Sequence, residues 1–424
     1  MVSCERTRYI VDAMKIFSVA LLLGTLVLSS TGASSAQSSV KVFTGLRLID
    51  GTGRAAIPDA AIVVRDGRIE SAGSGATVPV GAEEIDLTGK TVIPGLINSH
   101  GHVNDASRDL GVYAAYGVTT VFSLGDEQPP VFAARAGQDT PSLSRARVFV
   151  SGPVLSPSTP EEAREQVAEV AKLDVDFVKI RVDDNLGTSP KMPPEVYRAV
   201  IDEAHRLNLR VAVHLFYLSD AKLVLDSGAD LIAHSVRDRD VDAALLAALK
   251  EAGVCLCPTL MREVSIFVYE STPDFFDDPL FRAHADKAQV AQLRDPASQA
   301  ALREDPTAQR YKRALEVASR NVKALADAGI PITMGTDTGP VGRFQGYFEL
   351  MELELMVKAG LTPKQALEAA TRDAARCMQV DADLGTLEPG KWADFIALDA
   401  DPLSNISNVR AIDSVWIAGN RVPR

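Results

Sequence analysis

Eight short β-branched runs alternate with amphipathic helical segments through the middle of the chain, and this alternation restricts the fold more than any other feature. The runs cover residues 96–99, 118–124, 147–151, 177–182, 210–214, 231–234, 254–258 and 331–335. Strands that alternate with helices form βαβ units and a parallel sheet. Eight such units predict an α/β fold in which residues 91–384 close into a (β/α)8 TIM barrel.

Both ends of the chain have a different texture, with short alternating segments separated by Gly, Pro and Asp. The N-terminal segments read VFTGLRLID and AAIVVRDGRIESAG, and the C-terminal ones read KWADFIALDADPL and AIDSVWIAGNRV. Such alternation is typical of antiparallel strands. We therefore expect residues 38–90 and 385–424 to pair into one small β-sandwich domain. Two unrelated terminal hairpins are the alternative.

The first 36 residues have the features of a secretory signal peptide. Lys15 precedes the apolar stretch IFSVALLLGTLVL, and the small residues Ser34 and Ala36 suit a cleavage step near Ala36. The apolar stretch, residues 16–28, is shorter than the roughly 20 residues that span a bilayer. We expect a periplasmic or secreted protein without stable membrane insertion after cleavage, and a retained tether is the alternative.

Composition limits the partners and the number of domains. The formal net charge of −12 and the lack of a dense basic run argue against nucleic acid, because phosphate-backbone binding needs clustered Lys and Arg. A hydrophobic fraction of 46% over 424 residues suits one large domain with a small one. The expected partner is a small-molecule substrate, and a homo-oligomer stays open.

Three cysteines, Cys255, Cys257 and Cys377, follow the predicted signal peptide. An odd number does not form a complete disulfide framework. The spacing CLC puts Cys255 and Cys257 on one strand face, which is poor geometry for a mutual bridge. We interpret all three as small, buried, apolar residues.

Four of the six histidines fall where predicted barrel strands end: His100 and His102 in NSHGHV, His214 in VAVHL and His234 in LIAHS. Asp337 follows the last strand in MGTD. The side chains of His100 and His102 point to one face, because strand side chains alternate. Catalytic residues of such barrels gather at the carboxyl ends of the strands. Together these residues predict a divalent metal site, although each alone has a structural alternative as a core histidine or a turn-forming aspartate.

Lys179 lies within the apolar run DFVKIRV. Phe177, Lys179 and Arg181 share one strand face, and the aliphatic face belongs against the outer helices, so Lys179 points into the barrel. Burial lowers the pKa of an amine, and a neutral amine can take up carbon dioxide to form a carbamate that bridges two metals. The alternative is a lysine that reaches solvent or pairs with Asp183 or Asp184.

Two further histidines and one long insertion lie outside the predicted metal site. His205 sits within a helical segment and is interpreted as a helix-surface residue, whereas His284 receives no role. Residues 259–305 form a long insertion after the seventh strand, rich in aromatic and acidic residues. Long loops on the catalytic face are usually functional, so this segment is a candidate lid or specificity element.

The combination resembles the amidohydrolase superfamily, specifically its imidazolonepropionase-like and metal-dependent dipeptidase (prolidase-like) branch. The resemblance lies in VFTGLRLIDGTG, KTVIPGLINSHGHV, the lysine strand, the two single histidines, MGTDTG and DLGTLEPGKWADFIALDADPL. It implies two divalent metal ions, usually zinc, although the ligand types also suit manganese, cobalt or nickel. The more buried metal would be bound by His100, His102, Lys179 and Asp337. The second would be bound by carbamylated Lys179, His214 and His234.

The resemblance also implies an activity, hydrolysis of an amide C–N bond, in which Asp337 passes a proton to the leaving group. Tyr217 in HLFYLSD would bind the scissile carbonyl, as a comparable tyrosine does in related dipeptidases, with packing as the alternative. Arg181, Arg237 and Arg343 follow predicted strand ends, and one of them could bind a carboxylate of a dipeptide or N-acyl amino acid. A lactonase or phosphotriesterase using the same site is a competing hypothesis, and a noncatalytic metal-binding protein is a second.

Overall fold

A computed structural model describes residues 40–424, so the predicted signal peptide, residues 1–36, lies outside the described residues. Within the described part, none of the helices has the length and hydrophobicity needed to cross a bilayer.

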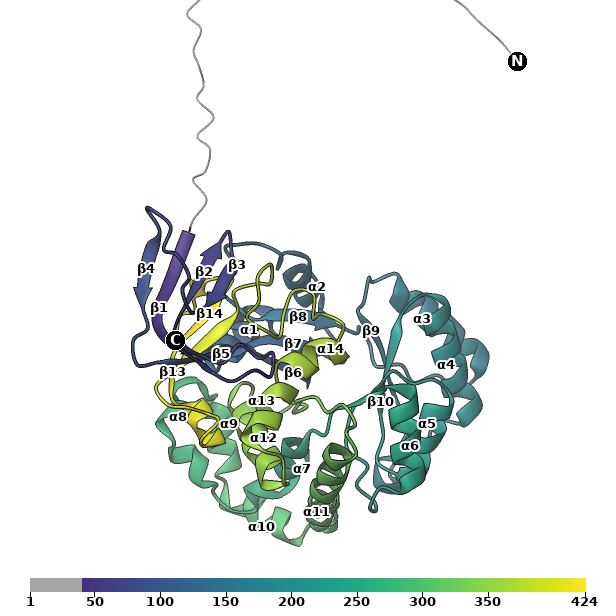
Figure 1. Ribbon diagram of the computed structural model, residues 1–424. Coiled ribbons are helices and arrows are strands. Elements are labelled where there is room, and N and C mark those ends of the chain that lie inside the picture. Colours follow the sequence, from purple (N-terminus) through teal and green to yellow (C-terminus); the bar gives the residue numbers. More distant parts are fainter. Residues whose placement is uncertain (1–39) are drawn as a thin grey trace, which may run out of the picture. The chain divides into compact units, whose positions relative to one another are not determined.

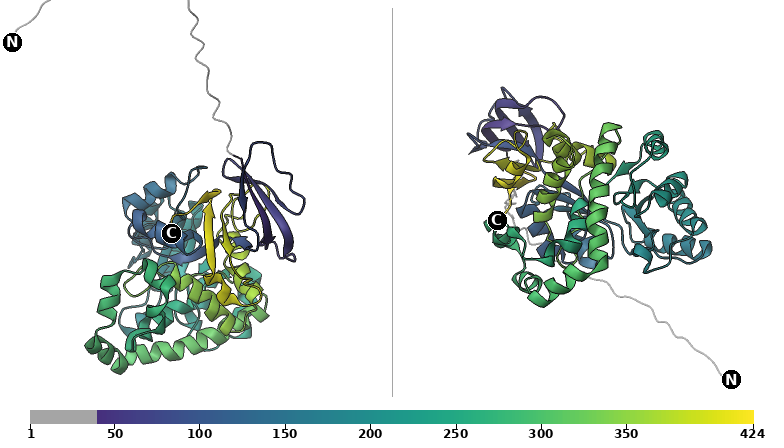
Figure 2. Two further views of the ribbon diagram at one scale, coloured as in Figure 1. Left: turned by 90° about the vertical axis from the view of Figure 1, so that its left-hand side faces the viewer. Right: turned by 90° about the horizontal axis from the view of Figure 1, so that it is seen from below.

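Strands from both ends of the chain form one eight-stranded sheet (Figure 1). Its strands are β1 (Val40–Leu48), β2 (Ile57–Arg65), β3 (Arg68–Gly73), β4 (Glu83–Asp86), β5 (Thr91–Pro94), β13 (Phe395–Leu398), β14 (Ile412–Ile417) and β15 (Asn420–Arg421). The order is β15-β14-β13-β5-β1-β2-β3, with β4 paired to β1. Antiparallel pairing of β13 with β5 joins the two ends, and Figure 2 shows the purple and yellow strands together.

An aromatic core explains why the two ends pair. The ring of Phe43 on β1 lies 4.8 Å from that of Phe395 on β13 and 4.7 Å from that of Trp416 on β14. All three side chains are buried, and burial of large aromatic rings stabilises such a domain by hydrophobic transfer and edge-to-face packing. The predicted β-sandwich built from both ends is confirmed, and two separate terminal hairpins are excluded.

Parallel strands form the barrel, as predicted. They are β6 (Leu96–Gly101), β7 (Val118–Ser123), β8 (Arg147–Val150), β9 (Phe177–Arg181), β10 (Arg210–His214), β11 (Leu231–Ile232) and β12 (Cys255–Leu256). They pair in the orders β6-β7-β8 and β9-β10-β11-β12. An isolated parallel bridge between Leu155 and Ile180 connects the two groups.

The eighth strand of the barrel is an irregular extended segment. Parallel bridges from Leu256 to Ile332 and from Gly101 to Thr338 place residues 331–338 between β12 and β6. Pro331 has no N–H to donate, which limits regular pairing at the start of the segment. The (β/α)8 closure is thus confirmed, although the last strand lacks the regular ladder of the others.

Helices cover the outside of the barrel. They are α1 (Ala106–Ala115), α2 (Pro129–Ala136), α3 (Pro160–Ala171), α4 (Pro194–Arg206), α5 (Leu218–Asp226), α6 (Ala243–Ala252), α11 (Pro306–Asp327), α12 (Tyr347–Lys358), α13 (Pro363–Ala369) and α14 (Arg372–Cys377). The start of α3 follows its sequence signals: the Thr159 side chain accepts from the backbone N–H of Glu162, and Pro160 occupies the first turn. His205 on α4 is half exposed and contacts Asp230, as expected for a helix-surface residue.

The predicted insertion is a set of short helices. These are α7 (Leu260–Phe267), the 3-10 turns η2 (Val268–Glu270) and η3 (Asp274–Asp277), α8 (Pro279–His284), α9 (Lys287–Leu293) and α10 (Pro296–Glu304). Several of its acidic residues are N-caps, because Asp278, Asp286 and Asp295 accept from first-turn N–H groups. Its aromatic residues anchor it: the ring of Phe281 lies 4.8 Å from that of Phe344, after the eighth strand.

Two of the three cysteines are bonded, which corrects the sequence interpretation. Cys255 at the start of β12 and Cys377 at the end of α14 form a disulfide across 122 positions, while Cys257 is free and buried as expected. The bond lines a pocket of about 580 Å³ together with Arg210, the first residue of β10. That pocket is therefore at the amino ends of the strands.

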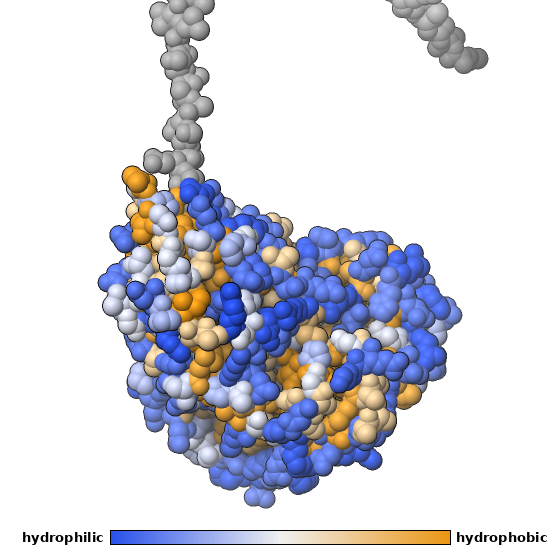
Figure 3. All heavy atoms as spheres, viewed as in Figure 1, coloured by the Kyte–Doolittle hydropathy of each residue, from blue (hydrophilic) through white to orange (hydrophobic). Residues whose placement is uncertain are grey.

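The surface is partly hydrophobic in this view of the molecule. In the region where Figure 1 draws α13 and α11, Figure 3 shows hydrophobic residues in a hollow.

Candidate metal centre and active site

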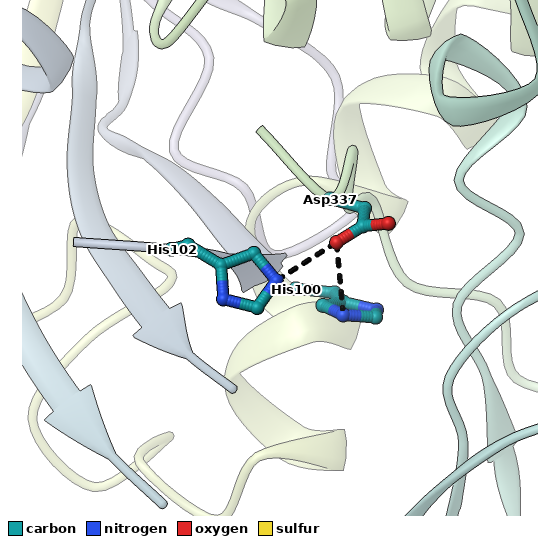
Figure 4. A group of neighbouring side chains, drawn as sticks. All are labelled: His100, His102 and Asp337. Atoms are coloured by element: carbon teal, nitrogen blue, oxygen red, sulfur yellow. Dashed lines mark hydrogen bonds and ion pairs between the residues drawn. The ribbon is translucent and has the colours of Figure 1, made fainter. Parts of the chain in front are cut away.

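His100, His102 and Asp337 converge where the barrel strands end (Figure 4). The Nε2 atom of His102 lies 2.8 Å from Oδ1 of Asp337, and Nε2 of His100 lies 3.6 Å from the same oxygen. Both histidines come from the end of β6, whereas Asp337 follows the irregular eighth segment and has a left-handed backbone with φ of 58°. An aspartate tolerates this conformation, which suits a turn directly after the strand.

His214 at the end of β10 and His234 just after β11 extend this cluster from another pair of adjacent strands. The ring of His234 lies 4.1 Å from that of His214 and 4.7 Å from that of His100. Its Nδ1 atom is 2.6 Å from Oγ1 of Thr259, while its buried Nε2 atom has no hydrogen-bond partner among the described residues. A ring held through one nitrogen with the other nitrogen free is the usual arrangement of a metal-binding histidine.

Lys179 points into the barrel, as its strand pattern predicts. Its Nζ atom lies 3.4 Å from Nε2 of His100, and the residue is 4% exposed. Burial lowers the pKa of Lys179 to about 8. Asp183 contacts His214 at 3.0 Å and Asp184 accepts from Tyr217 at 2.8 Å, so these carboxylates have other hydrogen-bonding partners.

The protonation of the cluster suits metal binding. Burial lowers the pKa of His214 to about 3 and holds the pKa values of His100 and His234 well below the usual range, so all three imidazoles are neutral. Burial raises the pKa of Asp337, but the charge of Arg343 and the hydrogen bond with His102 outweigh it and hold that pKa well below its ordinary value. Neutral imidazoles and an ionised carboxylate are the forms that bind cations.

The predicted substrate-binding residues differ in their surroundings. Tyr217 lies at the start of α5, with its hydroxyl on Asp184 and its ring 4.0 Å from Nζ of Lys191, so the described contacts do not join it to the six clustered residues. Arg237 is buried, its Nε lies 2.9 Å from Oε1 of Glu263, and its Nη1 donates to the backbone carbonyls of Leu215 and Ser235.

The two other predicted arginines contact the cluster itself. Arg343 Nη1 donates to Oδ2 of Asp337 at 2.5 Å. Nη2 of Arg181 lies 3.3 Å from Nε2 of His214. Both guanidinium groups therefore lie against residues of the cluster.

The carboxyl group of Glu349, which the sequence did not single out, is buried and binds side chains of the segments that carry the site. Oε1 of Glu349 on α12 accepts from Asn98 at 2.6 Å, Thr336 at 2.7 Å and Thr338 at 2.6 Å. Asn98 in turn accepts from the backbone N–H of His100 at 2.9 Å. This network fixes β6 and the eighth segment, which carry His100, His102 and Asp337. In FELMELEL, Glu349 looks like an ordinary helix carboxylate, so no signal in the sequence singles it out.

A protein-family model described as "Amidohydrolase family" matches residues 91–422. The chain belongs to the amidohydrolase family. This amidohydrolase is 26% identical over 377 residues to an imidazolonepropionase of Rhodococcus jostii (strain RHA1), covering 86% of this chain and 88% of the relative. An imidazolonepropionase of Nocardia farcinica (strain IFM 10152) is 25% identical over 384 residues, covering 85% and 91%.

Solved structures show the same fold. A putative prolidase from Bifidobacterium longum superposes with a TM-score of 0.75 at 27% identity, covering 91% of this amidohydrolase and 95% of that chain. A Xaa-Pro dipeptidase with bound methionine has a TM-score of 0.74 at 21% identity, covering 91% and 100%, which supports the shared fold. The recognition of an imidazolonepropionase-like amidohydrolase from sequence is therefore confirmed, and the protein is a hydrolase.

Proposed function

We propose that this protein is an exported, binuclear, metal-dependent amidohydrolase that hydrolyses an amide C–N bond in dipeptides or N-acyl amino acids. One observation carries the proposal. Six side chains spread from position 100 to position 337 meet at the carboxyl ends of the barrel strands: His100, His102, Lys179, His214, His234 and Asp337. Catalytic residues of this fold occupy that end.

The side chains present fit two divalent cations. The cluster offers four imidazoles and one carboxylate, and Nε2 of His234 is a buried nitrogen with no hydrogen-bond partner in residues 40–424. His100, His102, Lys179 and Asp337 would hold one ion, and Lys179 as a carbamate would hold the second with His214 and His234. Imidazole nitrogen and carboxylate-type oxygen are ligands that zinc accepts.

The chain's own residues have separate tasks in the proposed reaction. Bound divalent ions would polarise a carbonyl group and lower the pKa of water. Asp337 accepts the proton of the attacking water at its carboxylate and passes it to the leaving nitrogen. Tyr217 would reach the substrate carbonyl only after its hydroxyl leaves Asp184, which it contacts at 2.8 Å.

The relatives support hydrolysis of an amide C–N bond, and the positive charges beside the cluster support a substrate with a carboxylate. The family match and the likeness to a putative prolidase favour a C–N bond. Arg181 and Arg343 beside the cluster favour a substrate with a carboxylate, although the whole chain has a formal net charge of −12. Small molecules of the dipeptide or N-acyl amino acid class combine both features.

Export is proposed from the signal-peptide features of residues 1–36. The disulfide between Cys255 and Cys377 supports it, because such bonds persist in oxidising compartments such as the periplasm. Cell fractionation and N-terminal sequencing of the mature protein test this part. We expect a periplasmic or secreted chain that begins near Gln37, whereas an uncleaved cytosolic chain would contradict export.

The main experiment is metal analysis of purified protein, followed by a screen of dipeptides and N-acyl amino acids. We expect bound zinc or a similar cation, and turnover that a chelator abolishes and zinc restores. Faster turnover of lactones or aryl phosphotriesters than of any amide would instead favour the competing hydrolase activities. A protein that binds metal but turns over none of these compounds would be a noncatalytic family member.

A further inference from the structure

Three arginine side chains beside the metal-binding cluster share only two carboxylates. The side chains of Arg237, Arg262 and Arg343 are 1%, 6% and 15% exposed. Arg237 and Arg262 both contact Glu263, at 2.9 Å and 3.3 Å, whereas Arg343 contacts Asp337 at 2.5 Å. Because a guanidinium stays protonated in proteins, this group carries one positive charge in excess. An uncompensated buried charge is unfavourable unless another anion completes the group.

Arg237 and Arg262 both have buried guanidinium nitrogens without a hydrogen-bond partner among the described residues, and Arg262 is the one that lies beside Asp337. Its buried Nε atom has no hydrogen-bond partner among the described residues and lies 3.8 Å from Oδ2 of Asp337, beyond hydrogen-bond length. Its guanidinium group lies 4.7 Å from the centre of the Tyr311 ring. Stacking on an aromatic face holds a guanidinium in a fixed plane, as recognition of a carboxylate requires.

Asp337 lies between the imidazoles on one side and Arg262 and Arg343 on the other. Its Oδ1 atom faces His102, with Nε2 at 2.8 Å, while its Oδ2 atom faces Arg343 and Arg262. Arg343 is also held from its other side, because its Nε donates to Oγ of Ser265 at 3.1 Å. The anion-binding groups are therefore one carboxylate away from the metal-binding nitrogens. A ligand that spans both must have its carboxylate a few bonds from its reacting carbonyl.

We propose that Arg262 and Arg343 form the subsite that binds the substrate's free carboxylate. The inference rests on the proposed function and narrows it: the substrates are N-acyl α-amino acids or dipeptides with a free C-terminal carboxylate, and the matching amides are poor substrates. In such compounds the carboxylate is attached to the carbon that bears the amide nitrogen. The two guanidinium groups then compensate the substrate's charge and orient the amide toward Asp337.

Hydrolysis of matched pairs tests the subsite. The probes are N-acetyl derivatives of L-leucine, L-methionine, L-proline and L-phenylalanine, each as the free acid and as the C-terminal amide. For purified enzyme we expect kcat/KM to favour the acids by about tenfold to a hundredfold, as for a charge-assisted hydrogen bond in a buried site. Arg262→Lys should bring the ratio of kcat/KM for acid over amide, measured within the variant itself, to about one, because a lysine lacks the planar pair of N–H donors of a guanidinium.

Product binding gives a readout that does not depend on turnover. Calorimetry on the purified protein compares free L-leucine, L-methionine, L-proline and L-phenylalanine with their amides. We expect at least one acid to bind about tenfold or more tightly than its amide, and Arg262→Lys to remove the difference. Arg320→Met is the matched control, because Arg320 is a half-exposed arginine of α11 paired with Asp240 away from the site.

The two readouts separate failure of this inference from failure of the proposed function. If none of the pairs is hydrolysed but an acid binds in an Arg262-dependent way, the proposed hydrolysis fails and the carboxylate subsite stands. If acids and amides are hydrolysed equally and Arg262→Lys changes neither, the subsite is overturned and the amidohydrolase activity stands. Loss of acid preference in Arg320→Met to the same extent as in Arg262→Lys would also overturn it. Circular dichroism of each variant confirms that the compared proteins are folded.

Discussion

The Nζ atom of Lys179 lies 3.4 Å from Nε2 of His100, although the two residues are 79 positions apart and belong to different barrel strands. The amine can donate to the neutral imidazole at this distance, and it then occupies the nitrogen that a cation would bind. A carbamate on Lys179 would replace this contact with oxygen ligands for two cations. The strand pattern predicted that Lys179 points into the barrel, and its position beside His100 is the one that the proposed metal site requires.

Replacing Lys179 with alanine should lower both metal content and turnover, because the variant lacks the bridging ligand. A short carboxylic acid such as acetate or propionate should restore part of the activity by occupying the vacated volume. Metal analysis and turnover with increasing acid concentration measure these effects. Lys172→Ala is the control, since Lys172 is an exposed lysine paired with Glu169. Unchanged metal content in Lys179→Ala would exclude the bridging role.

Asp337→Asn should nearly abolish turnover while the protein stays folded. The amide cannot accept a proton as the carboxylate does, and general-base catalysis contributes about 10²–10⁴-fold to rate. Steady-state kinetics and circular dichroism check the two halves of the prediction. Asp327→Asn, at an exposed ion pair with Lys323, is the matched control. Turnover near that of wild type would remove Asp337 from the role of proton carrier.

Periodicity accounts for what the sequence predicted well. A strand of period two directs His100 and His102 to one side, and the same rule directs Lys179 inward, so those placements need no knowledge of distant residues. Arg262 and Glu349 escaped notice because their tasks depend on neighbours from other segments: Asp337 for the first and Asn98 for the second. Neither residue type nor local pattern distinguishes them from ordinary helix residues.

The disulfide was missed for a related reason. Cys255 and Cys377 are 122 positions apart, and only the packing of α14 against the amino end of the barrel brings their sulfur atoms together. Spacing within the sequence excluded a bridge between Cys255 and Cys257 but contained no information on a distant partner.

Cys377→Ala should lower the free energy of unfolding by about 2–4 kcal/mol, because the bond restricts the unfolded chain over a long loop. Urea unfolding followed by circular dichroism measures the difference. A reductant should destabilise wild type to about the level of the variant and leave the variant unchanged. Equal unfolding midpoints of wild type and variant without reductant would contradict the bond's contribution.

Glu349→Ala should weaken metal binding as well as stability. The side chains of Asn98, Thr336 and Thr338 would lose their shared acceptor, and a buried donor left unsatisfied costs about 1–3 kcal/mol. Asn98 and Thr336 would keep their hydrogen bonds to Thr336 and Thr338, which limits the loss. Burial raises the pKa of Glu349, which disfavours its charged form, and Glu349→Gln keeps an acceptor oxygen at the same place, so this variant should be far milder. Thermal unfolding and metal titration compare the two variants. Equal losses in both would show that the negative charge, and not the acceptor, is what the network needs.

Glu352 should make stability depend on pH. Burial raises the pKa of this carboxyl group from 4.5 to about 8, although the backbone N–H groups of Met261 and Leu260 donate to it and oppose the rise. Between these two pKa values the folded chain keeps a proton that the unfolded chain has released, so the stabilising contribution is complete below about pH 4.5 and is lost as pH rises toward about 8.

Glu352→Gln isolates this effect, since the amide does not titrate. Across that pH window the unfolding free energy of wild type should fall relative to the variant by up to about 1.4 kcal/mol per pH unit, the limit for one proton. Urea unfolding at several pH values measures the difference between the two proteins, which cancels the titration of all other groups. Parallel pH profiles would mean that Glu352 is ionised in the folded protein, with the two N–H groups of α7 sufficient to hold its charge.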